Sequence, residues 1–294
     1  MYGSDCKHFL YKDCYAREIF VFFTQQDFYC YNISVMVVVI TGGSSGIGLE
    51  TARLFSQNKQ FIVYVLNRHE VKLDNVNWIK CDVSNSKDIA NAVSEITREE
   101  NNQINLLINN AGMGISGAIE YHSEEEINKI ISVNLVGLVN VTRAFLPYMN
   151  KGSKIINISS VAGPISIPFQ TLYSVTKAGV LAFSNGLRNE LRPLGIKVTS
   201  VLPGDTKTGF TSSREKSVDN GRYGKRIEKS VSKMEKDESN GVPASKVAKK
   251  IFKVSKKKNP NTYYVVGSSY KLLVFLSRIL PKRLVNWIIF KIYG

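Results

Sequence analysis

Hydrophobic positions along the chain form short runs that alternate with longer stretches of helical periodicity. The runs predict buried strands at residues 36–40, 61–66, 76–80, 104–108, 153–158, 196–202 and 263–266. The stretches between them predict helices near residues 46–58, 86–100, 123–149, 171–193 and 243–256. Because strands rich in Val and Ile alternate with helices, we expect an α/β fold, in which a doubly wound parallel sheet of seven strands carries helices on both faces.

Two regions depart from this alternation. Residues 1–35 contain ten aromatic side chains but no recognisable motif, and Met36 stands directly before the first predicted strand. We therefore expect residues 1–35 to be an N-terminal extension, either disordered or not native, and residues 36–267 to form the catalytic domain. Residues 204–241 are rich in Ser, Lys, Glu and Gly, which is typical of a lid or a mobile segment.

The last segment, residues 268–294, predicts a basic amphipathic helical tail. Pro281 separates two short apolar helical stretches, because proline is tolerated at a helix start but not inside a helix. Five basic residues and no acidic ones lie among the apolar positions of residues 270–293. Such a segment suits a helix at a membrane interface. The alternative is that the tail packs on the enzyme body, covers the substrate cleft or forms a dimer contact.

The net charge of +15 is unevenly distributed, since residues 214–294 carry 20 Lys and Arg against 6 Asp and Glu. A basic segment fits an anionic membrane surface, a nucleic acid or a solvated face. No nucleic-acid-binding motif accompanies it, so we expect no nucleic-acid partner. No uncharged apolar run is long enough for a membrane span. We expect a cytoplasmic protein with peripheral membrane contact through residues 270–293.

The cysteines do not predict a metal site. The four cysteines form no C-x-x-C pair, and Cys6, His8, Cys14 and Cys30 match no common zinc spacing. We expect reduced thiols and no bound metal.

A glycine-rich segment connects the first predicted strand to the helix that follows. Residues 41–48 read TGGSSGIG. Glycine lets the backbone turn tightly and approach a pyrophosphate, and a helix N-terminus offers free N–H groups. The spacing differs from the common G-x-G-x-x-G fingerprint, and a purely structural turn is the alternative. Its position between strand and helix favours a dinucleotide site in a Rossmann-type fold.

Three side chains form a candidate catalytic set. Tyr173 and Lys177 lie four residues apart in a predicted helix and so share one face. A nearby positive charge lowers the pKa of a tyrosine from its free value of about 10. Ser160 follows the predicted strand at 153–158 and places a hydroxyl at its carboxyl end. For an isolated Y-x-x-x-K, a surface pair is the alternative.

Further short motifs follow the predicted strands in order. They are CDV at 81–83, NNAG at 109–112, VNLVG at 133–137, SS at 159–160 and PG at 203–204, with Thr208 four residues later. Together with the glycine turn and the Ser160, Tyr173 and Lys177 set, this series resembles the short-chain dehydrogenase/reductase superfamily over residues 36–267. The resemblance is to its branch of about 250 residues, and to members that act on hydroxysteroids, retinoids and keto-lipids.

The resemblance implies a role for each matched residue. Tyr173 is implied to donate a proton in carbonyl reduction, and Ser160 to hydrogen-bond the substrate oxygen. Lys177 is implied to bind the nicotinamide ribose and lower the pKa of Tyr173, and Asn134 to help hold a relay water. Backbone capping is the alternative for Asn109 and Asn134. The implied cofactor-binding residues are Thr41, Gly42, Ser44, Ser45, Gly46, Ile47, Gly48, Asn67, Arg68, Asp82, Val83, Asn109, Ala111, Gly112, Tyr173, Lys177, Pro203, Gly204 and Thr208.

The end of the second predicted strand bears on the choice of cofactor. NAD enzymes usually place an acidic residue there to bind the ribose hydroxyls. This chain has Asn67 and then Arg68, which can pair with a 2′-phosphate. We therefore expect NADP(H), with NAD(H) as the alternative, because Ser44 and Ser45 occupy the turn where many NADP enzymes carry a basic residue.

The sequence thus predicts an NAD(P)-dependent oxidoreductase that acts on a ketone or secondary alcohol. The tail and the polar segment resemble those of relatives acting on steroids, retinoids or keto-lipids, so we expect a lipophilic small-molecule substrate and a homo-oligomer. The alternatives are a non-catalytic scaffold of the same fold and a sugar-nucleotide epimerase. The intact Ser160, Tyr173 and Lys177 set argues against the first, and the glycine spacing argues against the second.

Overall fold

The computed structural model describes residues 21–24, 27–30, 35–216 and 221–294. The chain divides into two compact units, residues 1–34 and residues 35–294. In the first unit, β1 (Val21–Thr24) pairs antiparallel with β2 (Asp27–Cys30), a hairpin that the sequence did not indicate. The predictions for Cys6, His8 and Cys14 fall outside the described residues.

The second unit is built around a parallel sheet of seven strands in the order β13-β9-β8-β6-β3-β4-β5. These strands are β3 (Met36–Thr41), β4 (Phe61–Asn67), β5 (Val76–Lys80), β6 (Ile104–Asn109), β8 (Met149–Ile158), β9 (Lys197–Pro203) and β13 (Tyr263–Val266). Each coincides with a predicted strand, so the predicted α/β fold is confirmed. The strand order reverses beside β3, and ligands of such sheets bind at the carboxyl ends near that point.

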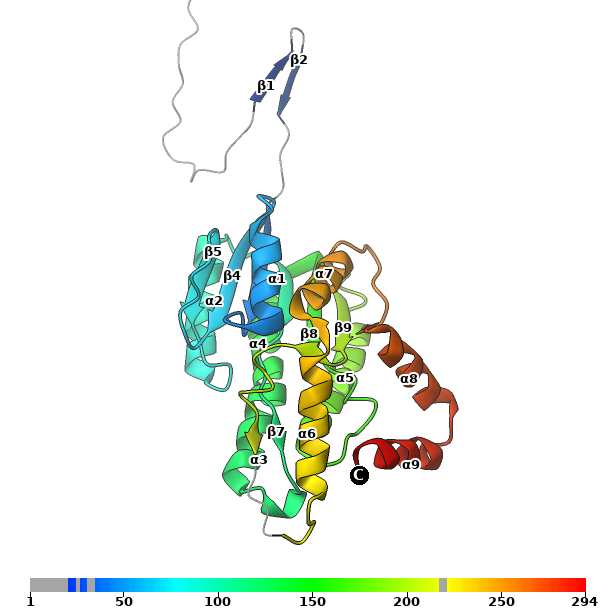
Figure 1. Ribbon diagram of the computed structural model, residues 1–294. Helices are drawn as coiled ribbons and strands as arrows, with labels where there is room; N and C mark the ends of the chain where they lie inside the picture. The colour runs from blue at the N-terminus through cyan, green and yellow to red at the C-terminus, as the bar shows by residue number, and fades with distance from the viewer. Residues whose placement is uncertain (1–20, 25–26, 31–34, 217–220) are drawn as a thin grey trace, which may run out of the picture. The chain divides into compact units, whose positions relative to one another are not determined.

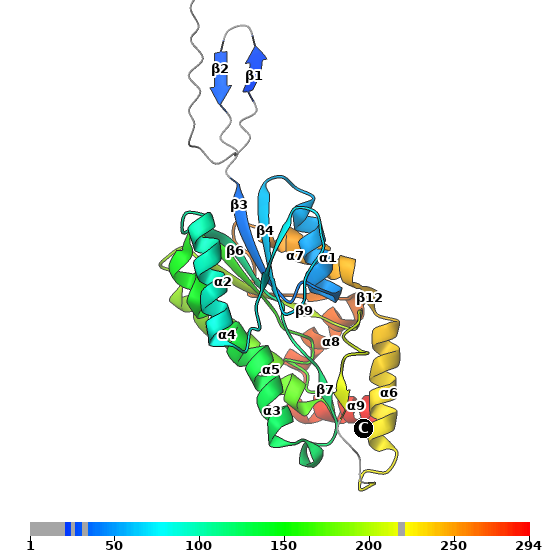
Figure 2. The same ribbon diagram turned by 90° about the vertical axis from the view of Figure 1, so that its left-hand side faces the viewer.

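Helices cover both faces of this sheet (Figures 1 and 2). On one face α1 (Gly46–Ser56) and α7 (Ala244–Ser255) bury Phe55 and Ile251 completely. On the other, α2 (Ser86–Glu99), α4 (Gly137–Phe145) and α5 (Thr171–Glu190) contribute Ile96, Phe145 and Leu187 to the core. Each fully buried side chain of this size contributes about 1.5–3 kcal/mol to stability. Because helices cover both faces of the sheet, the side chains on both sides of the central strands are buried, and these strands are apolar throughout.

The long helix predicted at 123–149 consists of several pieces. α3 (Glu124–Ile131) leads into a π-helical turn (Ser132–Val136), then α4, and a 3₁₀ turn (Leu146–Tyr148) completes the stretch. Its length and hydropathy would suffice to cross a membrane. Ile130, Val141 and Phe145 are fully buried in the protein, however, so this stretch is a core element.

The polar segment 204–241 contains a helix that the sequence analysis did not predict, α6 (Arg226–Ser239). Its buried face consists mainly of Ile227, Val231 and Met234 among many charged positions, too narrow a stripe to be recognised. Short strands flank it: β10 (Thr206–Lys207) pairs with β12 (Val242–Pro243), and β11 (Glu215–Lys216) pairs with β7 (Ile115–Ser116). A 3₁₀ turn (Ile119–Tyr121) follows β7.

The C-terminal tail forms the two predicted helices, α8 (Ser268–Ile279) and α9 (Lys282–Tyr293), on either side of Pro281. Val274, Val285 and Ile289 pack into an apolar cluster with Val161 and Leu202 of the enzyme body. The tail therefore packs on the body through one face, as one of the two interpretations expected. Large apolar side chains of the tail remain exposed: Leu272, Phe275, Ile279, Leu284, Trp287, Phe290 and Ile292.

Two helical glycines, one at the glycine turn and one at an exposed position, differ in how closely other atoms approach them. A Cβ added to Gly48 would lie 2.1 Å from the carbonyl oxygen of Gly42, whereas a Cβ added to Gly186 would meet nothing within 4 Å. We predict that Gly48→Ala lowers the free energy of unfolding by about 1–3 kcal/mol through overpacking. Gly186→Ala, at an exposed position of α5, should raise it by about 0.5–1 kcal/mol, because alanine loses less backbone entropy. Denaturant unfolding measures both, and equal shifts would contradict the close approach.

Candidate active site

A pocket with a volume of about 470 Å³ lies at the carboxyl ends of β3, β4, β6, β8 and β9. This size is typical of small-molecule and cofactor sites. Most of the residues predicted for the site line it. They are Gly42, Ser44, Ser45, Gly46, Ile47, Asn67, Arg68, Asp82, Val83, Ala111, Gly112, Ser160, Tyr173, Lys177, Pro203, Gly204 and Thr208. Thr41, Gly48, Asn109 and Asn134 do not line it.

The glycine turn joins β3 to α1 on one side of the pocket. Gly42 has a φ of +70°, a conformation that favours glycine. Ser45 precedes the first helical residue, and its side chain makes no capping hydrogen bond. The N–H groups in the first turn of a helix have no intrahelical acceptor, so this turn can donate them to an anion in the pocket.

Thr41 and Asn110 hold this turn to the end of β6. The Thr41 hydroxyl oxygen accepts hydrogen bonds from the backbone N–H groups of Asn110 and Ala111, both at 3.0 Å. In return, the Asn110 amide donates to the carbonyls of Thr41 and Gly42 at 3.1 and 2.8 Å. Thr41 therefore holds the pocket wall in place without lining the pocket itself. Asn110, which the sequence analysis did not select, lines the pocket.

Asn109, which was expected to support the cofactor-binding strand, points into the protein interior. Its amide donates to Thr142 and to Asn157, each at 2.9 Å, and the residue is 2% exposed. These bonds tie β6 to α4 and β8. The side chain thus supports the strand but does not reach the pocket, because alternate residues of a strand point to opposite faces.

Ser160, Tyr173 and Lys177 share one wall of the pocket. Ser160 follows β8, and its Oγ accepts from the N–H of Ala162 at 3.1 Å. Lys177 lies one turn after Tyr173 on α5, and its Nζ is 5.6 Å from the centre of the Tyr173 ring. The ammonium of Lys177 also donates to the carbonyl of Ile158 at 3.1 Å.

Burial controls the acidity of this set. It raises the pKa of Tyr173 to about 12, against a hydrogen bond with Ser160 that lowers the pKa. Burial also lowers the pKa of Lys177 to about 8, so that the ammonium remains the main form at neutral pH. The expected lowering of the Tyr173 pKa by Lys177 is not found in this structure. Desolvation outweighs the favourable contacts of the phenol, and Lys177 directs its ammonium to the backbone of β8.

Asn134 lies fully buried in the π-helical turn beneath the pocket. Its Oδ1 accepts from the N–H of Met113 at 2.7 Å, and its amide donates to the carbonyl of Met113 and to Thr176. A Cβ added to Gly112 would lie 3.3 Å from the Oδ1 of Asn134 and 3.5 Å from the Nζ of Lys177. Asn134 and Lys177 therefore flank the same backbone position, which only glycine fits without displacement.

Arg68 and Asp82 mark one end of the pocket. Arg68 is exposed beyond the end of β4. Although burial opposes it, hydrogen bonds from Ser84 and the charge of Arg68 hold the pKa of Asp82 below its usual value. Asn67 instead donates to the carbonyl of His69 at 2.9 Å. This end therefore presents one guanidinium and one carboxylate to a ligand.

The other end of the pocket is formed by residues that sequence reasoning missed. Phe210 packs against Tyr173, with ring centres 5.7 Å apart. Further residues lining this end are Ile167, Gln170, Met234 and Tyr293, together with the carboxylates Asp205 and Glu238. They come from the loop after β8, the polar segment, α6 and α9. No motif marks them, because their neighbourhood depends on how these segments fold over the sheet.

Comparisons with known proteins agree with this geometry. Residues 36–219 match the family model of short chain dehydrogenases. A 3-ketodihydrosphingosine reductase of Bacteroides thetaiotaomicron is 37% identical over 257 residues, which cover 85% of this chain and 95% of that protein. The mitochondrial D-beta-hydroxybutyrate dehydrogenase of Rattus norvegicus is 34% identical over 184 residues, or 57% of this chain and 53% of that protein.

A solved structure has the same architecture. The short-chain dehydrogenase from Streptomyces avermitilis superposes with a TM-score of 0.75 at 26% identity, and the match covers 86% of this chain and 96% of that one. Fold, family model and relatives agree on one assignment. The chain belongs to the short-chain dehydrogenases/reductases and is an NAD(P)-dependent oxidoreductase acting on CH–OH or keto groups.

Proposed function

We propose that the protein transfers a hydride between NADP(H) and a lipophilic ketone or secondary alcohol, with Ser160, Tyr173 and Lys177 as the catalytic core and Asn134 as their support. The observation that carries the proposal is that these three side chains line the same pocket as the glycine turn. A phenol, a hydroxyl and an ammonium at the ends of β8 and α5 suit proton transfer to a carbonyl oxygen.

Each residue has a distinct task in this mechanism. The nicotinamide supplies or accepts the hydride. Tyr173, whose pKa of about 12 leaves it protonated at neutral pH, donates its proton to the carbonyl oxygen during reduction. Ser160 donates a hydrogen bond to the same oxygen as negative charge develops on it. The ammonium of Lys177 stabilises that charge at close range, in a site where water does not screen it.

The residues at the glycine turn fit a dinucleotide. The turn and the start of α1 can hold the pyrophosphate, and Asp82 and Val83 line the place for the adenine. Pro203, Gly204 and Thr208 line the same pocket, with Thr208 beside Gly46 of the turn. We propose NADP(H) over NAD(H), because Arg68 offers a guanidinium to a 2′-phosphate and Asn67 offers no carboxylate to the ribose hydroxyls.

A lipophilic substrate is supported by the far end of the pocket. Ile167, Met234, Phe210 and Tyr293 provide apolar surface there. Relatives with lipid-related names, the 3-ketodihydrosphingosine reductase and the D-beta-hydroxybutyrate dehydrogenase, point the same way. We propose a keto-lipid.

We propose further that the protein is cytoplasmic, forms a homo-oligomer and touches membranes through residues 270–293. The exposed apolar face of α8 and α9 lies among Lys271, Arg278, Lys282, Arg283 and Lys291. Such a face suits an anionic bilayer surface, where apolar side chains enter the headgroup region and basic ones contact lipid phosphates. Because a lipid substrate resides in membranes, this contact would bring the enzyme to it.

The first prediction from the proposal concerns the proton donor. Tyr173→Phe removes only the phenolic hydroxyl, so we expect loss of ketone reduction by at least about a hundredfold, the usual contribution of acid catalysis. Binding of NADPH, followed by its fluorescence, should weaken far less than turnover does. The assay is oxidation of NADPH with a panel of ketones, with Tyr148→Phe, outside the pocket, as a control. Retained turnover in Tyr173→Phe would overturn the mechanism.

The cofactor preference is tested at Arg68. Arg68→Gln removes the charge that we assign to the 2′-phosphate, and we expect the preference for NADPH over NADH to fall by about 10- to 150-fold. Dissociation constants measured by titration give this result without any substrate. The control is Arg53→Gln on α1, whose guanidinium pairs with Glu50 and which does not line the pocket. A wild-type preference for NADH would refute the assignment of Arg68.

Membrane contact is tested with the double variant Phe275→Ser/Trp287→Ser, which removes two side chains that are 58% and 57% exposed. We expect binding to vesicles of phosphatidylglycerol and phosphatidylcholine to weaken at least tenfold, because burying each side chain is worth about 1.5–3 kcal/mol. Ile119→Ser/Leu194→Ser, with 53% and 59% exposure elsewhere, is the matched control. Equal vesicle binding by both double variants would exclude the tail as the contact.

A further inference from the structure

Glu238 lies in the last turn of α6 and lines the substrate end of the pocket. Met234, four residues earlier on the same helix face, lines it as well. The Glu238 side chain is 16% exposed, so it meets the pocket in a largely desolvated position. A carboxylate on such a wall interacts strongly with whatever occupies the space beside it, because water screens it little.

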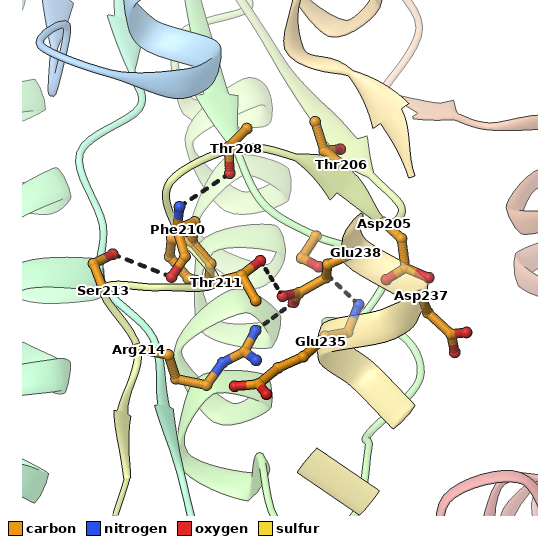
Figure 3. Close-up of polar contacts among 12 residues, drawn as sticks. Asp205, Thr206, Thr208, Phe210, Thr211, Ser213, Arg214, Glu235, Asp237 and Glu238 are labelled. Carbon is orange, nitrogen blue, oxygen red and sulfur yellow. Dashed lines mark hydrogen bonds and ion pairs between the residues drawn. The ribbon is translucent and has the colours of Figure 1, made fainter. Parts of the chain in front are cut away.

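Two donors from the polar segment fix the orientation of this carboxylate (Figure 3). The hydroxyl of Thr211 donates to Oε2 at 2.6 Å, and the Nη2 of Arg214 donates to Oε1. The Arg214 side chain is 1% exposed and is not among the residues lining the pocket. Arg214 therefore stands behind Glu238, which is the member of the pair that a substrate meets.

The charges around the pair leave an excess of negative charge. Asp205, which lines the pocket, lies close enough to both Asp237 and Glu238 to interact with them electrostatically. Burial raises the pKa of Asp205, and the charges of Asp237 and Glu238 raise it further, against a hydrogen bond from Tyr270 and the charge of Lys233. Among the described residues that act on this group, Arg214 and Lys233 face the carboxylates of Asp205, Asp237 and Glu238, and Lys233 pairs with Asp237 at 3.0 Å.

The charges of Glu238 and Arg214 also act on Tyr173, the proposed proton donor. Apart from burial, Glu238 raises the pKa of Tyr173, and Arg214 lowers it by less. At the phenol of Tyr173, the effect of the Glu238 carboxylate therefore outweighs that of the Arg214 guanidinium. A neutral ketone bound there would leave the carboxylate facing an apolar group, which is costly for a desolvated charge. A cation bound there would compensate it.

We propose that Glu238 binds a protonated amino group close to the substrate carbonyl, so that the enzyme prefers amino ketones to neutral ketones of the same chain length. The inference rests on the proposed reductase function and narrows its substrate class. Thr211 and Arg214 act as positioning residues that hold the carboxylate. The bound ammonium would also oppose the effect of Glu238 on Tyr173 and so ease proton donation.

The wild-type enzyme provides the first test. Three ketones with the same alkyl chain are compared: an alkyl aminomethyl ketone below the pKa of its amine, its N-acetyl derivative, and the alkyl methyl ketone. We expect kcat/KM for the amine to exceed that for the N-acetyl ketone at least tenfold, the typical worth of a charge-assisted contact. Equal or lower kcat/KM for the amine overturns the proposal. This test needs no variant and does not depend on the stability of one.

The second test is Glu238→Gln, which keeps the shape and removes the charge. Its preference for the amine should fall about tenfold, mainly through KM, while kcat/KM for the neutral ketone falls less. Glu235→Gln is the matched control, since Glu235 precedes it by one turn on α6, pairs with Lys216 at 2.7 Å and does not line the pocket. A purely structural role for Glu238 would lower kcat/KM for all three ketones equally, and that result also overturns the proposal.

Failure of the proposed function can be told apart from failure of this inference. If none of the ketones is reduced, the proposed reductase function fails. The role of Glu238 is then tested by ligand binding alone. In calorimetric titration with NADPH present, hexylamine should bind wild type at least tenfold more tightly than hexanol does, and Glu238→Gln should remove this difference. If the neutral ketone is reduced and hexylamine shows no advantage over hexanol, only the inference on Glu238 fails.

Discussion

The hydrogen bonds between Thr41 and Asn110 are the interaction on which the rest of the site depends. They join the ends of β3 and β6, the two strands beside the point where the order of the sheet reverses. Both asparagine donors are used on the carbonyls of Thr41 and Gly42, which fixes the glycine turn before α1 begins. Gly48 can then approach the Gly42 carbonyl so closely that no other residue fits without displacement. The anion-binding turn is thus held by hydrogen bonds between neutral side chains and the backbone, and does not depend on a charged side chain.

The same burial that shapes the pocket sets a chemical constraint on it. Ser160, Tyr173 and Lys177 lie where strands end and α5 covers the sheet, so each loses water on folding. Desolvation moves the pKa of Tyr173 up and that of Lys177 down, towards the neutral form of each group. Because a tyrosine is already protonated at neutral pH, the higher pKa makes Tyr173 a weaker acid, and the hydrogen bond with Ser160 opposes this effect. The ammonium stays charged at neutral pH and gains strength from its dry surroundings.

Much of this could be predicted from the sequence because the relevant physics is local. Seven apolar runs gave seven strands, and the TGGSSGIG segment gave the turn between β3 and α1. The choice between Asn109 and Asn110 could not be made in this way, since it depends on which face of β6 meets the pocket. α6 was missed because its stripe is narrow and its partners, such as Phe169, lie far away in sequence. The lowering of the Tyr173 pKa was wrongly expected from spacing, which contains no information about desolvation.

The contacts of α6 connect the substrate end of the pocket to the C-terminal tail. Tyr293, at the end of α9, lines the pocket and donates to Asp237 at 3.4 Å, and Asp237 precedes Glu238 on α6. The guanidinium of Arg226, at the start of α6, lies 5.8 Å from the ring of Phe290, an exposed member of the apolar face of α9. A surface that bound α9 would therefore affect the contacts of α9 with both ends of α6. Because α6 carries Met234 and Glu238, side-chain contacts join the pocket wall that would meet the substrate's polar group to the face of α9 that would meet a bilayer.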